Sequence, residues 1–139
     1  VPCSEHATII AQCTPRGSGA LALLRLSGPD ALSIATKLSK LPGGKTITTV
    51  ASHTIHAGHA VRLNNQPIDY VMFFVMHGPR TFTGEDVVEI STHNNQFIIQ
   101  EIVELAITHG ARLAQEGEFC KRAVMNKKID LIQAEAINE

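Results

Sequence analysis

Residues 81–95 read TFTGEDVVEISTHNN, a stretch that places a strand directly before a helix. Residues 87–92 are rich in β-branched side chains, which is typical of a strand. Asn94 or Asn95 follows and can cap a helix that runs to about Thr108. Glu89 interrupts the apolar strand pattern, and a carboxylate is costly to bury without a partner. The stretch therefore predicts a strand, a helix and an acidic side chain whose partner has to be found.

The segment 20–26, ALALLRL, is ambiguous between a helix and a strand. Alanine and leucine favour a helix, but the segment is short and a new helix start follows it at 27–30, SGPD. A stripe of apolar side chains continues from that start, formed by Ala31, Ile34, Ala35 and Leu38. We therefore predict a strand over 20–26 and a helix after it.

The middle of the chain predicts a hairpin. Two extended runs, 53–63 and 68–76, flank the turn sequence NNQP at 64–67. Strands are also predicted over 8–13 and 111–114. Helices are predicted over 95–108 and 118–125, the first with an apolar stripe of Ile98, Ile102, Leu105 and Ala106. Strands and helices mix without strict βαβ alternation, so the predicted fold class is α+β.

Composition limits the class of protein. The chain has 139 residues, 44% of them apolar, and a net charge of −1, which suits one ordinary core. No stretch is dense in lysine or arginine, which argues against a nucleic-acid groove formed by this chain alone. Three scattered cysteines indicate a reducing compartment. No signal peptide and no apolar run of about 20 residues is visible, so we expect a soluble, cytoplasmic protein without a membrane span.

Several short motifs suggest a cofactor or metal, but each lacks its required context. The segment 17–22 fits G-x-G-x-x-A, yet a strand is predicted after it where a dinucleotide site needs a helix. PGGKT at 42–46 lacks the first glycine of a phosphate loop. His53, His56 and His59 do not share one strand face, because side chains alternate. Cys120 has no histidine near it in sequence. We predict neither a metal site nor a catalytic residue.

Three charged residues remain because they interrupt apolar context: Arg25, Glu89 and Lys128. Strand alternation places Glu89 on one face with Val87 and Ser91, and Arg25 with Leu21 and Leu23. One interpretation is an internal Arg–Glu pair, or edge positions whose charged ends reach water. The other is a pocket that presents one carboxylate and two cations. The spacing alone leaves both open.

A family resemblance favours the pocket. The segments TIIAQCTPRGSGALALLRLSGPDA, GPRTFTGEDVVEISTHNN and EGEFCKRAVMNKKIDLIQAEAI resemble, in order and spacing, the amino-terminal region of the tRNA-modification GTPase family MnmE, also called TrmE. The likeness extends over about 8–138. It implies a tetrahydrofolate-binding and dimerisation domain over 1–125, with a mixed β-sheet and packed helices similar to the folate-binding domain of the glycine-cleavage T-protein.

The resemblance also implies what surrounds this domain. Residues 126–139 would be the first segment of a truncated helical domain, and the Ras-like G domain, with its GTP, potassium and magnesium, would be missing. The chain begins without methionine and ends within a helical pattern, so we expect a piece of a longer protein that does not hydrolyse GTP by itself. The family forms homodimers and modifies carbon 5 of the wobble uridine in tRNA together with the flavoprotein MnmG.

The cofactor that the resemblance implies is 5-formyl- or 5,10-methylene-tetrahydrofolate, the expected one-carbon source. Carried over residue by residue, its contacts fall on Arg25, Glu89 and Lys128. A carboxylate can accept two neighbouring N–H groups from a pterin edge, so we expect Glu89 to bind that edge. The family's usual His-Gly-Gly is here His93-Asn94-Asn95, which leaves the fine shape of that loop open.

Two other functions compete with folate binding. The first is a pure dimerisation module without retained folate. The second is a free-standing one-carbon transferase, which would need more chain around the site than these residues supply.

Overall fold

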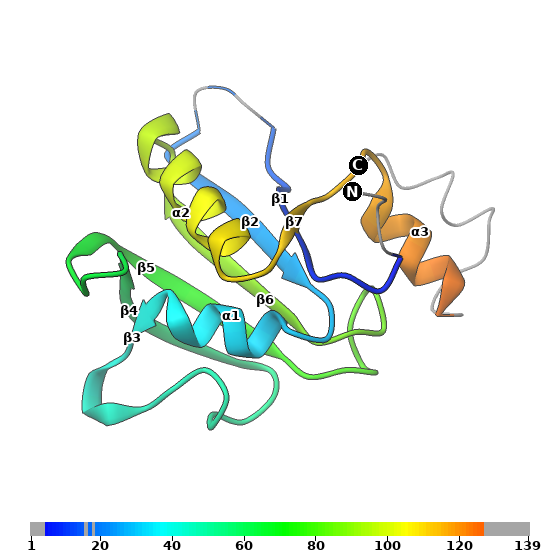
Figure 1. The fold of residues 1–139 in the computed structure, drawn as a ribbon, viewed down its shortest axis with the longest axis horizontal. Coiled ribbons are helices and arrows are strands. Elements are labelled where there is room, and N and C mark those ends of the chain that lie inside the picture. The colour runs from blue at the N-terminus through cyan, green and yellow to red at the C-terminus, as the bar shows by residue number, and fades with distance from the viewer. Residues whose placement is uncertain (1–4, 16, 18, 127–139) are drawn as a thin grey trace.

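Leu21–Ser27, the segment that was ambiguous from its composition, is an interior strand of a seven-stranded sheet. The computed structural model describes residues 5–15, 17 and 19–126. The sheet is mixed and carries helices, which confirms the α+β prediction (Figure 1). In chain order the elements are β1 (Ile9–Gln12), β2 (Leu21–Ser27), α1 (Ala31–Lys37), β3 (Ser39–Lys40), the 3-10 turn η1 (Pro42–Gly44), β4 (Thr54–Val61), β5 (Pro67–Met76), β6 (Val87–His93), α2 (Gln96–Thr108), β7 (Arg112–Leu113) and α3 (Glu118–Met125).

The strand order is β3-β4-β5-β6-β2-β1-β7. All neighbours pair antiparallel except β1 and β7, which pair in parallel. The predicted hairpin is present as β4 and β5. Because β2 lies between β1 and β6, segments from the start and middle of the chain form the centre of the sheet.

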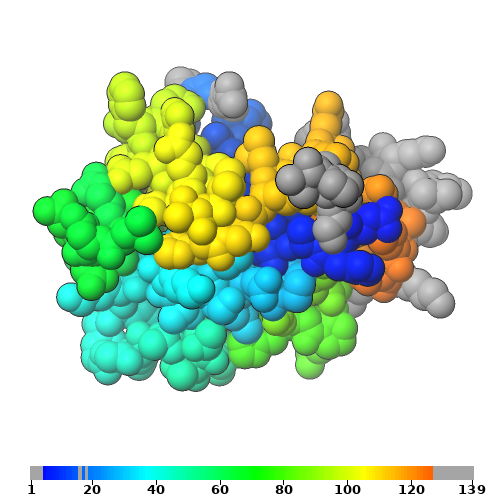
Figure 2. All heavy atoms as spheres, in the orientation of Figure 1, coloured from blue at the N-terminus to red at the C-terminus, as the bar shows by residue number. Residues whose placement is uncertain are grey.

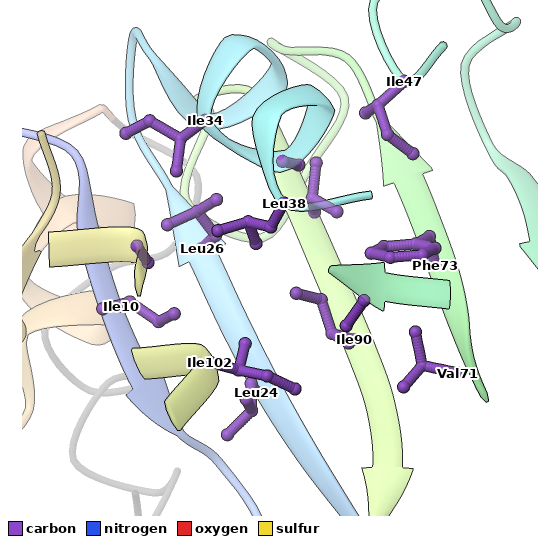
Figure 3. Close-up of a cluster of buried hydrophobic side chains, with 14 of the residues drawn as sticks. Ile10, Leu24, Leu26, Ile34, Leu38, Ile47, Val71, Phe73, Ile90 and Ile102 are labelled. Atoms are coloured by element: carbon purple, nitrogen blue, oxygen red, sulfur yellow. The ribbon is translucent and has the colours of Figure 1, made fainter. Parts of the chain in front are cut away.

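The helices α1 and α2 pack on one face of the sheet, where they lie toward the viewer in Figure 2. Leu24 and Leu26 of β2, with Phe73 of β5, are fully buried beneath them. Ile34 of α1 and Ile102 of α2 complete this core, which Figure 3 shows in close-up. Burial of each such side chain stabilises the fold by about 1.5–3 kcal/mol, so this face supplies most of the hydrophobic stabilisation.

Within the part of the chain that the structure describes, the opposite face is covered at one end. There the loop between β5 and β6 lies over β2, and the Oγ atoms of Ser27 and Thr83 are 2.8 Å apart. Beyond the cover, large apolar side chains are open to solvent. Leu21 is 60% exposed, Ile55 56%, Tyr70 56% and Met72 40%. We call these four residues, with the half-buried Leu23 and Phe74 between them, the open sheet face.

Two details differ from the sequence predictions. Helix α1 begins at Ala31 with Asp30 as its N-cap, so most of the predicted start at 27–30 precedes the helix. On α2 the buried stripe is Ile99, Ile102 and Ala106. Ile98 and Leu105, which were predicted in the main stripe, are half-buried at its borders, because the sheet contacts the helix along the line through Ile99.

No helix in the described part of the chain is long and apolar enough to cross a membrane. The helical pattern at the end of the chain lies outside the described residues, as does Lys128.

Candidate functional site

A cavity of about 410 Å³ lies on the side of the sheet away from α1 and α2. Its lining comes from the end of β1 and the residue after it (11–13), Arg25 of β2, Phe82 of the β5–β6 loop, the segment 114–117 and Phe119 of α3. Two other hollows, of about 400 and 440 Å³, are more open to solvent and lie elsewhere. The first cavity contains Arg25, which was predicted to bind a ligand.

Arg25 and Glu89 form an ion pair. They are direct cross-strand partners on β2 and β6, and Arg25 Nε donates a hydrogen bond of 2.7 Å to Glu89 Oε2. Their side chains are 20% and 19% exposed, so the pair is largely withdrawn from water. The structure thus contains the internal Arg–Glu pair that was one of the two interpretations. Arg25 also lines the cavity, whereas Glu89 is not among its lining residues.

Two aromatic rings flank the Arg25 guanidinium. Its Cζ atom lies 5.4 Å from the ring centroid of Phe82 and 5.1 Å from that of Phe119. These distances are within the range of a cation–π contact. Both rings line the same cavity, so the cavity presents a cation held between two apolar surfaces.

A buried ion network joins the segments that carry these rings. Arg122 of α3 is 2% exposed and donates to both carboxylate oxygens of Glu85, at 3.2 and 3.1 Å. It also donates to Glu118 at 3.2 Å. Glu118 in turn accepts two hydrogen bonds from Arg112, at 2.7 and 2.6 Å. Two arginines thus balance two glutamates, and the network ties the β5–β6 loop to α3 and β7.

The environment of Glu118 favours its ionised form. The hydrogen bonds from Arg112 lower the pKa of the Glu118 carboxyl from 4.5 to about 2, against the opposing effect of burial. The backbone N–H of Gln115 and the charges of Arg112 and Arg122 act in the same direction as these bonds. The carboxylate is therefore charged at neutral pH and holds α3 in place.

His93, Asn94 and Asn95 each have a different structural role at the end of β6. His93 Nδ1 lies 2.9 Å from Asp69 Oδ1. Asn94 Nδ2 donates to the carbonyl oxygens of Gly17 and Gly19 at 2.7 and 2.6 Å, which ties the β1–β2 connection to β6. Asn95 accepts from the amides of Phe97 and Ile98 and so caps α2 as predicted.

The other sequence candidates are not brought together. His53 precedes β4 and its Nε2 lies 3.0 Å from the carbonyl oxygen of Arg80, while the ring of His59 contacts Tyr70. Within residues 5–15, 17 and 19–126 there is no group of three side chains that could hold a metal ion. Cys120 is buried, and Cys13 is exposed at the cavity.

Sequence reasoning missed Phe82, Phe119 and the ion network. Phe82 and Glu85 lie within the TFTGED stretch, and Phe119 and Arg122 within EFCKRA. Charged residues lie close to both phenylalanines in sequence, which could have drawn attention to the two segments. The sequence does not show which of these charged residues form ion pairs. As arranged, the cavity can bind a planar group through apolar ring contacts and supply N–H donors to its acceptor atoms.

Comparison with known proteins adds a family match. The family model described as "GTP-binding protein TrmE N-terminus" matches residues 8–128. A protein named tRNA modification GTPase MnmE in Lysinibacillus sphaericus is 53% identical over 134 residues, 96% of this chain and 29% of that protein. Proteins of the same name in Bacillus subtilis and Streptococcus thermophilus are 52% and 54% identical, over 94% and 96% of this chain and 28% of each of theirs. The chain therefore spans less than a third of the length of these relatives.

Proposed function

The chain belongs to the family of TrmE N-termini, and from this premise we propose that it is a tetrahydrofolate-binding, dimerising domain of a tRNA-modifying GTPase. The whole protein would modify carbon 5 of the wobble uridine in tRNA, in the cytoplasm, together with the flavoprotein MnmG. GTP, potassium and magnesium would bind a separate G domain. The folate, either 5-formyl- or 5,10-methylene-tetrahydrofolate, supplies the one-carbon unit when bound.

The observation that carries folate binding is the cavity at Arg25. Its volume of about 410 Å³ falls within the range of small-molecule sites. The rings of Phe82 and Phe119 offer apolar surface for a flat heterocycle, and Arg25 offers donors for its oxygen atoms. Glu89 pairs with Arg25 but does not line the cavity, so in this proposal it would accept from donor groups of the ligand at the cavity's edge. These residue types fit the group, with Lys128 as a further predicted contact outside the described residues.

The open sheet face supports the dimer. Monomeric soluble proteins rarely expose a large contiguous apolar patch, and such a patch marks an interaction site. Leu21 lies on β2, and Tyr70 and Met72 lie on β5, with β6 between the two strands. Arg25 and Glu89, the charged pair at the border of the face, neutralise one another, so a second copy would meet no unbalanced charge from them.

This face also favours the alternative function, a pure dimerisation module without folate. Both functions need the exposed apolar surface, but only folate binding needs the cavity and its cation. A measurement of ligand binding therefore distinguishes the two functions.

Calorimetric titration of the purified chain with 5-formyltetrahydrofolate tests the proposal. We expect saturable binding, and a loss of at least tenfold in affinity for Arg25→Met. Arg80→Met is the matched control, because Arg80 is exposed and lies outside the cavity lining. A folded dimer that gives no binding heat would replace the folate function with the dimerisation module.

A further inference from the structure

Arg25 is fixed on more sides than an ordinary surface arginine. Its Nε is engaged by Glu89 at 2.7 Å. The rings of Phe82 and Phe119 lie 5.4 and 5.1 Å from its Cζ atom. Because Arg25 also lines the cavity, a ligand there would meet a guanidinium whose orientation is already set.

The two rings come from segments that are far apart in sequence. Phe82 belongs to the β5–β6 loop, and Phe119 is the second residue of α3. Neither segment is part of the sheet that positions Arg25. Their convergence on one guanidinium therefore depends on how the loop and the helix are held against each other.

The buried ion network holds them. Arg122 of α3 binds Glu85, which lies three residues after Phe82 in the loop, and Ser27 Oγ of β2 donates to the same carboxylate at 2.8 Å. Asn126 Nδ2 adds a bond of 2.8 Å to the carbonyl oxygen of Thr83. Removing one charge from such a buried set leaves another charge unpaired, which is strongly unfavourable. The positions of both rings are thus fixed independently of any ligand.

We infer that Phe82 and Phe119 are positioning residues that act through Arg25. They hold the plane of the guanidinium in one orientation at the cavity wall. A planar group with acceptor atoms fits a guanidinium held in this way, such as a carboxylate or a ring carbonyl beside a ring nitrogen. The identity of the ligand in this inference rests on the proposed function. The fixed orientation of Arg25 is a property of the protein without any ligand.

The test compares Phe82→Leu with Phe82→Tyr. Leucine keeps apolar volume but removes the ring face, whereas tyrosine keeps the ring. We expect Phe82→Leu to weaken 5-formyltetrahydrofolate binding about three- to tenfold and Phe82→Tyr to stay within twofold of the parent. In an Arg25→Met background, Phe82→Leu should have no further effect. Phe97→Leu is the matched control, since Phe97 is exposed on α2, away from the cavity.

A ligand-independent measurement separates this inference from the folate proposal. The NMR signal of the Arg25 Nε–H should carry a ring-current shift and exchange slowly with solvent in the unliganded protein. Phe82→Leu should move that signal and speed its exchange, and Phe82→Tyr should restore both. Equal signals in the leucine and tyrosine variants would overturn the inference, as would a full effect of Phe82→Leu on affinity without Arg25. If the Arg25 Nε–H signals behave as expected but no folate binds, only the proposed ligand is overturned.

Discussion

Arg25 and Glu89 stand opposite each other on β2 and β6, and their side chains meet at the border between the covered and open parts of one sheet face. The register between β2 and β6 places the two side chains next to each other. A slip of one residue would place the two side chains on opposite faces of the sheet. The charged centre of the site therefore depends on the same apolar alternation that builds the core.

The first prediction concerns the coupling of this pair. Glu89→Leu should lower the free energy of unfolding by about 1–3 kcal/mol, because it leaves the largely buried guanidinium without its carboxylate. The double variant Arg25→Met/Glu89→Leu should be less destabilised than the sum of the two single variants. Urea unfolding of the four proteins measures this. Strict additivity would show that the pair contributes no coupling.

The second prediction concerns the buried network. Arg122→Met should destabilise the fold by about 3–5 kcal/mol, because Glu85 and Glu118 then lose a shared cation in a largely buried site. Lys121→Met is the control, since Lys121 is exposed and should change stability by less than about 0.5 kcal/mol. Chemical unfolding at neutral pH compares the two. Similar stabilities for both variants would contradict a structural role of the network.

The elements of the fold could largely be predicted, because their signals are local. The strand over 20–26 followed from the helix start after it, and Asn95 followed from its place before an apolar stripe. The strand order was not accessible in the same way. The contact between Arg25 and Glu89 joins residues that are 64 positions apart, and alternation assigns each side chain a face without stating which strands are neighbours.

The candidate site shows the same limit more sharply. Arg25 could be singled out because it interrupts an apolar run, and the structure does place it in a cavity. Phe82 and Phe119 could not be singled out, since an aromatic residue is expected in a core whatever its other role. Their common relation to Arg25 arises from the docking of α3 against the β5–β6 loop, which no short sequence pattern encodes.

The third prediction concerns acid stability. Because the pKa of Glu118 is lowered to about 2 in the folded chain from 4.5, its contribution to stability is fully present above about pH 5 and is lost as the pH falls toward 2. Glu118→Gln should therefore flatten the decline of stability over that interval. Thermal unfolding between pH 2 and 7 measures the change. An unchanged decline in the variant would remove Glu118 as a source of the acid sensitivity.

The fourth prediction concerns the cap of α2. Asn95→Ala should cost about 1 kcal/mol, because the amides of Phe97 and Ile98 lose their acceptor. Asn95→Asp, which keeps the accepting oxygen and adds a negative charge at the helix start, should retain stability. Urea unfolding distinguishes the two changes. Equal losses for alanine and aspartate would show that the side-chain oxygen is not what matters.

The fifth prediction concerns the open sheet face. Met72→Lys should convert a dimer to a monomer in sedimentation experiments, because a second copy would have to bury an unpaired ammonium group against Leu23 and Tyr70. The fold itself should survive, since Met72 is exposed in the single chain. Leu63→Lys is the control, because Leu63 is also apolar and exposed but follows β4 in the hairpin turn. A dimer that tolerates Met72→Lys but dissociates with Leu63→Lys would move the interface from the sheet face to the hairpin, and the sheet face would then need another partner.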